Sequence, residues 1–290
     1  MNRFPDHARV VFIGDSITCG GIWIAHIYDY YLRHFPKSDI RMYNAGISGG
    51  STTSALEYYD RGNGENYKPT HAVIMLGMND VWRGLYEIKP EENDIADKQP
   101  AKRMEAIGNY EKRLRTLTSL LLERGVKLTF VTPTIYDEST DPRALDKIGC
   151  DAGLEYLGEI NRRIAAQTGS DFVNLHAPIR FLNAAHPMIR ADRVHPNEFG
   201  HVCMAHLFLA AQGLVDEPTA LSVDSLPGWE ELLPAKPVVW LQTTWEGGRH
   251  PVKVAPYTSG MLDTYRNNIL ACLMLSTSNG RGKFNVRATD

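Results

Sequence analysis

Short apolar segments alternate with longer amphipathic ones along the first 215 residues of the chain. Runs rich in Val, Ile, Leu and Phe predict strands at residues 9–13, 40–44, 72–76, 128–132 and 172–175. Leucines and isoleucines at helical spacing predict helices at residues 102–123 and 152–167. A last helix is expected after Asn197, a suitable N-cap, and before Gly213.

The predicted strands are apolar without strict alternation of apolar and polar positions. Such strands are typical of a parallel sheet whose two faces are both covered by helices. Strands that alternate with helices indicate βαβ units. The sequence therefore predicts an α/β fold, a three-layer α/β/α sandwich with a mostly parallel, five-stranded, flavodoxin-like sheet.

The composition changes after Gly213. Four prolines, at positions 218, 227, 234 and 237, exclude a long helix from the next stretch. Further on, "VVWLQTTW" and "HPVKVAPY" resemble strands, "LDTYRNNILACLML" suits a helix or a strand, and "STSNGRGKF" resembles a turn. We therefore divide the chain into a domain at residues 1–216 and a C-terminal extension at residues 217–290, of undetermined fold and with β-rich parts.

Overall composition excludes several classes of protein. The chain has 290 residues, 43% of them hydrophobic, and a net charge of −3, so neither nucleic acid nor a membrane is an expected partner. Its four cysteines are far apart in sequence, which indicates reduced thiols. No apolar signal segment precedes the first strand, and no run reaches the ~20 apolar residues of a membrane span. These features predict a cytoplasmic protein, and they leave its oligomeric state open.

Four polar patterns lie at the ends of predicted elements. "GDS" (residues 14–16), "NAGISGGST" (44–52) and "GMND" (77–80) follow the first three strands, and "DRVHPN" (192–197) precedes the last helix. Open parallel sheets bind ligands at the carboxyl ends of their strands. Each pattern alone has an ordinary explanation, because a serine after a strand is usually a helix N-cap and an Asn-Asp pair is usually a turn.

Together and in this order, the four patterns resemble the SGNH hydrolases, also called the GDSL esterase and lipase family. This chain has GDSI where the family name has GDSL. The resemblance covers residues 8–213 and implies an ester hydrolase that needs no cofactor or metal. It implies roles for five residues: Ser16 as the nucleophile, His195 and Asp192 as its catalytic partners, and Gly49 and Asn79, with the Ser16 backbone, as oxyanion-hole donors.

The chemistry of these side chains agrees with those roles. A serine hydroxyl needs an adjacent base, and histidine can accept and return its proton near neutral pH. Asp192 precedes His195 by three residues, so its carboxylate can orient the imidazole if the segment turns. The backbone N–H groups of Ser16 and Gly49 and the Asn79 amide are suitable donors to an oxyanion.

Three other interpretations of the candidate site remain open. "GISGG" matches the nucleophile elbow of α/β-hydrolases and makes Ser48 an alternative nucleophile, although polar residues rather than a strong helix follow it. His195, His201 and His206 are near one another in sequence, but their spacing is not that of a known metal motif. A non-catalytic carbohydrate-binding protein could have the same fold.

The substrate is less well defined by the sequence. Trp82 and Tyr86 follow Asn79 closely and are candidate pocket residues, whereas Trp23 has the pattern of a core residue. The sequence has no long apolar lid segment of the kind that an interfacial lipase uses. We expect a small-molecule ester substrate with a short acyl chain, such as an acetylated carbohydrate. A lipase or thioesterase acting on longer acyl chains is the alternative.

Overall fold

The computed structural model describes residues 1–63, 67–87, 99–139, 146–185, 187–215, 238–243 and 249–253. Its strands are β1 (Arg9–Gly14), β2 (Arg41–Gly46), β3 (His71–Met75), β4 (Lys127–Val131), β5 (Asp171–Val173), β6 (Val238–Thr243) and β7 (Arg249–Lys253). Its helices are α1 (Ser16–Cys19), α2 (Ile22–His34), α3 (Thr52–Asp60), α4 (Pro100–Glu123), α5 (Cys150–Thr168), α6 (His176–Ala185) and α7 (Glu198–Ala211), with a 3₁₀ turn, η2 (Arg83–Tyr86).

The strands form one sheet in the order β5-β4-β3-β1-β2-β6-β7. All neighbouring pairs are parallel except β6 and β7, which are antiparallel. From β1 the chain continues to β2 on one side and then to β3 on the other, so the winding reverses at β1. A ligand site is expected at the carboxyl ends of the strands beside such a reversal. The three-layer α/β fold with a mostly parallel sheet, predicted from the sequence, is confirmed. The expected number of five strands is wrong, because β6 and β7 join the sheet and the described part of it has seven.

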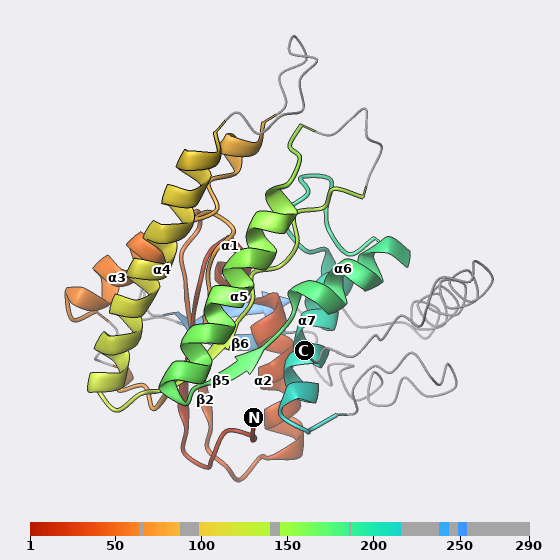
Figure 1. Ribbon diagram of the computed structural model, residues 1–290. Coiled ribbons are helices and arrows are strands. Elements are labelled where there is room, and N and C mark those ends of the chain that lie inside the picture. The colour runs from red at the N-terminus through yellow and green to blue at the C-terminus, as the bar shows by residue number, and fades with distance from the viewer. Residues whose placement is uncertain are drawn as a thin grey trace.

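Helices cover both faces of the sheet (Figure 1). One core contains side chains from α3, α4 and α5 together with Val11 and Ile13 of β1. The other contains side chains from α2, α6 and α7 together with Val10 and Phe12 of the same strand. Successive side chains of a strand point to opposite faces, so β1 has to be apolar at every position from Val10 to Ile13 to fill both cores.

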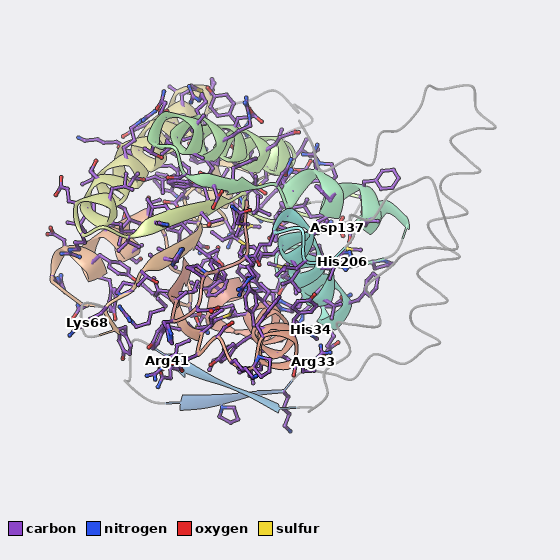
Figure 2. All side chains as sticks on the ribbon, turned by 90° about the horizontal axis from the view of Figure 1, so that it is seen from below. Arg33, His34, Arg41, Lys68, Asp137 and His206 are labelled. Atoms are coloured by element: carbon purple, nitrogen blue, oxygen red, sulfur yellow. The ribbon has the colours of Figure 1, made fainter. Side chains whose placement is uncertain are left out.

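Two strands of the C-terminal extension join the same sheet. Strand β6 lies parallel to β2, with Tyr43 opposite Gln242 and Asn44 opposite Thr243. Leu241 of β6 is fully buried in the core shared with α2 and α7. Figure 2 shows β6 and β7, in blue, at the edge of the sheet beside Arg41, the first residue of β2. The expected strands near Val238 and His250 are therefore present.

The other segments predicted for the extension, "LDTYRNNILACLML" and "STSNGRGKF", lie outside the described residues. The division of the chain at residue 216 stays a prediction.

The described helices are amphipathic or packed into the two cores. Among the described residues, no helix combines the length and the apolar character that crossing a membrane requires.

Candidate active site

The loops after β1, β2 and β3 carry the residues that the sequence indicated. Ser16 follows β1, Gly49 follows β2 and Asn79 follows β3. Because these strands are neighbours and parallel, their carboxyl ends meet at one edge of the sheet. The sheet thus places the three loops together although Ser16 and Asn79 are 63 positions apart in the sequence.

Ser16 is the first residue of helix α1 and does not cap it. The cap is Asp15, whose carboxylate accepts a hydrogen bond of 2.9 Å from the backbone N–H of Ile17. The Ser16 hydroxyl instead contacts His195, with 2.8 Å between Oγ and Nε2. Gly14 ends β1 at a place without room for a side chain, because a Cβ there would lie 2.1 Å from the Thr18 hydroxyl and 2.8 Å from the backbone oxygen of Met75.

His195 and Asp192 lie in the loop before α7. The Nδ1 atom of His195 is 2.8 Å from Oδ2 of Asp192. The other carboxylate oxygen accepts bonds of 3.0 and 2.9 Å from the backbone N–H groups of Val194 and His195. Arg193, with a φ of 65°, turns the chain so that the carboxylate reaches back to the imidazole. A serine hydroxyl, an imidazole and a carboxylate thus form a continuous hydrogen-bonded chain.

The Asp192 carboxylate is held in its ionised form. Partial burial alone would raise its pKa, but the bonds from the His195 and Val194 backbone and from the imidazole outweigh it, and the pKa lies below the usual value. An acceptor that stays ionised keeps the proton of His195 on Nδ1. The Nε2 atom is then free of a proton and can accept one from Ser16.

Gly49 occupies a backbone conformation that favours glycine. Its φ is 70°, and a Cβ built on it would meet nothing within 4 Å. The positive φ, rather than lack of space, is therefore the reason for glycine at this position.

The Asn79 amide is fixed in orientation by two neighbours. Its Nδ2 donates a bond of 2.8 Å to the backbone oxygen of Gly50, and its Oδ1 accepts a bond of 3.1 Å from Arg83. Because a guanidinium can only donate, Oδ1 must face Arg83 and the NH₂ group must face Gly50. The bond to Gly50 uses one of the two amide hydrogens, which leaves the second for a ligand.

Two residues without an assigned role in the sequence analysis connect these loops. Asp80 accepts hydrogen bonds from the backbone N–H and the hydroxyl of Thr52, so it joins the loop after β3 to the start of α3. Arg83 orients Asn79 as described above. Their signal in the sequence is weak. Asp80 is only a charged residue directly after Asn79, and Arg83 is only a charged residue four positions after Asn79.

The three aromatic residues differ sharply in exposure. Trp82 is 61% exposed and lies with Asn79 beside a hollow of about 310 Å³. Tyr86 is only 5% exposed and packs in the core against Gly153, with Arg103 over its ring at 4.0 Å. Trp23 is fully buried, as expected. The expectation that Tyr86 borders the pocket is corrected, because the 3₁₀ turn after Trp82 directs it inward.

His201 and His206, which suggested a metal site, are both buried in α7. Burial lowers the pKa of His201 to about 3, helped by His26, Arg190 and His195 nearby. Within the described parts of the chain, no three His, Cys, Asp or Glu side chains are grouped so as to hold a metal ion. The described part of the structure thus gives no support to a metal site formed by these histidines.

Asp15 makes the stability of the protein depend on pH. Burial, above all, raises the pKa of its carboxyl to about 6 from 3.8. The folded state then prefers the protonated form, so the stability contributed by this group is complete below pH ~4 and is lost as the pH rises through ~6. The cost above that pH is about 3 kcal/mol at most.

We expect Asp15→Asn to stabilise the protein above pH 7, because the amide oxygen can still accept the Ile17 N–H bond without a buried charge. Urea denaturation at pH 8 should show a gain of about 1–3 kcal/mol, and the gain should shrink toward pH 4. An equal difference at both pH values would contradict the role of this carboxyl.

Known proteins resemble this chain in sequence and in fold. Residues 12–202 match the GDSL-like Lipase/Acylhydrolase family. An acetylxylan esterase of Geobacillus stearothermophilus is 28% identical over 224 residues, which are 71% of this chain and 94% of that protein. The crystal structure of Axe2, an acetylxylan esterase of that organism, is similar with a TM-score of 0.58 at 26% identity, over 72% of this chain and 95% of that one.

A gut microbial diltiazem-metabolizing enzyme has the same fold, with a TM-score of 0.60 and 25% identity. That similarity covers 74% of this chain but 49% of the other, so this chain spans about half of that enzyme. The family match extends from β1 into α7 and includes all five residues to which the sequence motifs pointed. The chain belongs to the GDSL-like lipase/acylhydrolase family of ester hydrolases.

Proposed function

We propose that this protein is a serine esterase in which Ser16 is the nucleophile, His195 the general base and Asp192 the residue that orients it. The observation that carries the proposal is the continuous chain of two 2.8 Å contacts from Ser16 Oγ through the imidazole to Asp192. In this arrangement the hydroxyl, the base and the orienting carboxylate are already within hydrogen-bond distance without a substrate.

In the first half of the reaction, Ser16 Oγ bonds to the carbonyl carbon of the ester while its proton moves to Nε2 of His195. The carbonyl oxygen becomes an oxyanion, and the backbone N–H groups of Ser16 and Gly49 and the second amide hydrogen of Asn79 donate to it. One such donor is typically worth about 10²–10³ in kcat. The C–O bond then breaks, and His195 returns its proton to the departing alcohol, leaving an acyl group on Ser16.

In the second half, water attacks the acyl carbon and His195 takes a proton from it. The same donors stabilise the second oxyanion, and its collapse releases the carboxylic acid. The proton on His195 returns to Ser16 Oγ, which restores the enzyme. No metal or cofactor takes part in these steps.

We propose an acetylated carbohydrate as the substrate. One support is the similarity to acetylxylan esterases. The other is the hollow beside Asn79, whose remaining lining is mostly polar and charged: Ser51, Asp80, Trp82, Lys102, Glu105, Ala106, Asn109 and Arg113. An exposed indole face among hydrogen-bonding side chains suits a sugar ring, which is apolar on its faces and polar at its rim.

Acetate release from acetylated xylo-oligosaccharides, run beside hydrolysis of p-nitrophenyl acetate, tests this substrate. We expect both substrates to be hydrolysed, and Trp82→Ala to raise KM about five- to tenfold for the sugar alone, as loss of one aromatic contact would do. Turnover of p-nitrophenyl acetate without acetate release from the sugar would overturn the carbohydrate proposal. Failure with both esters would favour a non-catalytic binding protein.

We also propose that the enzyme acts in the cytoplasm. Three of its cysteines, Cys19, Cys150 and Cys203, are unpaired thiols, as is usual in a reducing compartment. This location favours soluble oligosaccharides over polymers as substrates. Cell fractionation with activity measured in each fraction tests it, and activity confined to the medium would contradict it.

A further inference from the structure

A second hollow lies beside the loop that contains Gly49, and residues 46–48 of this loop line it. Its volume is about 440 Å³. Its lining combines residues that follow β1 and β2 with residues of the extension: Cys19, Gly20, Asn44, Gly46, Ile47, Ser48, Leu241, Thr243, Pro251 and Val252. We refer to it as the β6–β7 hollow, because these strands supply one wall.

That wall is fixed in position by the sheet and by packing. Pairing of Asn44 with Thr243 holds β6 beside β2, and β7 in turn pairs with β6. Leu241 and Val252 pack so closely on Gly21, at the start of α2, that a Cβ there would lie 3.1 and 3.2 Å from their methyl carbons. The extension therefore contributes apolar side chains at a defined place.

The opposite wall adjoins the catalytic residues. Cys19 ends the four-residue helix that Ser16 begins, so the two residues are about 5 Å apart along the helix axis. Ser48 is bonded directly to Gly49. Ile47 donates from its backbone to the oxygen of Gly14, with an N–O distance of 3.0 Å, which keeps the two loops together. The hollow thus begins one residue from one proposed oxyanion donor and one helical turn from the proposed nucleophile.

The two hollows differ in chemistry. The hollow beside Asn79 contains Lys102, Glu105 and Arg113. Among the described residues that line the β6–β7 hollow, none is charged, and its walls include Ile47 and Pro251 as well as the two aliphatic residues packed on Gly21. An ester consists of an alcohol part and an acyl group. Because a sugar alcohol suits the charged hollow, the apolar hollow is available to the acyl group.

We propose that the β6–β7 hollow binds alkyl acyl chains longer than acetyl, of about four to eight carbons, so that the extension sets acyl-chain specificity. This proposal rests on the esterase function above and extends its substrates beyond acetyl esters. Each methylene that enters an apolar site is worth up to about fourfold in kcat/KM. The enzyme should therefore hydrolyse p-nitrophenyl hexanoate with a kcat/KM at least tenfold above that for the acetate.

Val252→Trp in the full chain tests the proposal, because Val252 lines the hollow and the larger side chain fills it. We expect it to lower the hexanoate-to-acetate ratio of kcat/KM at least tenfold. Lys253→Trp is the matched control, since Lys253 is exposed on the same strand and does not line the hollow. It should leave that ratio unchanged. A ratio unaltered by Val252→Trp, or altered equally by both variants, would overturn the proposal.

Alkylation of Cys19 gives a second test, in which the hollow is filled in the wild-type protein. Cys19 is exposed, whereas Cys150 and Cys203 are buried, so N-ethylmaleimide should modify Cys19 in the folded protein and occupy the hollow. The hexanoate-to-acetate ratio should fall in the wild type and not in Cys19→Ser. If the ratio stays constant after alkylation, the acyl-chain proposal fails while acetate turnover still supports the esterase. Absence of all ester turnover would instead reject the esterase function itself.

Discussion

Ser16→Ala is expected to lower kcat by about 10⁴–10⁶-fold and to abolish covalent labelling by a fluorophosphonate. The reason is the 2.8 Å contact between Ser16 Oγ and His195 Nε2, which would activate this hydroxyl. The measurements are steady-state hydrolysis of p-nitrophenyl acetate and mass spectrometry of the labelled peptide. The adduct should lie on the peptide that contains Ser16.

Ser48→Ala is the matched control, because Ser48 also follows a strand and lies among glycines. Ser48 is exposed and lines the β6–β7 hollow, and it adjoins the proposed donor Gly49. Its loss could shift that donor, so a decrease in kcat of about 10–100-fold agrees with the proposal. A fluorophosphonate adduct on the Ser48 peptide would reject Ser16 as the nucleophile and restore the nucleophile-elbow reading.

The fold of the first 215 residues was predictable because local patterns determine most of it. Strand β1 is apolar at every position from Val10 to Ile13, and this run requires helices on both faces of the sheet. Helix α5 has Leu154, Leu157, Ile160 and Ile164 on one buried stripe, and the structure extends the expected helix by only a residue or two at each end. Such signals depend only on residues that are near one another in the sequence, so they can be recognised without knowledge of the tertiary structure.

The position of the extension could not be predicted in the same way. The pairing of Asn44 with Thr243 joins residues about 200 positions apart, and nothing local to either strand specifies the partner. Without β6, strand β2 would be an edge with unpaired backbone groups, which is a reason for the extension to cover it. The strands of the extension were predictable from the sequence, whereas the sheet that they join was not.

The candidate site was predictable where topology alone brings residues together. Ser16, Gly49 and Asn79 follow three neighbouring parallel strands, so any such sheet would gather them. Contacts that depend on side-chain direction were not predictable. Tyr86 turns into the core after Trp82 adopts a left-handed conformation with a φ of 55°, and nothing in the sequence marks that turn.

Asp192→Asn is expected to lower kcat by about 10³–10⁴-fold while leaving KM and the thermal unfolding midpoint nearly unchanged. The amide oxygen can still accept the Val194 and His195 backbone bonds that shape the loop. The amide nitrogen then faces Nδ1 of His195, and because it can only donate, the imidazole must carry its proton on Nε2 and cannot accept one from Ser16. The variant also lacks the negative charge that stabilises the imidazolium. Steady-state kinetics measures kcat and KM, and thermal unfolding followed by circular dichroism measures the midpoint. A folded variant that keeps more than about a tenth of the wild-type kcat would show that Asp192 does not orient the base.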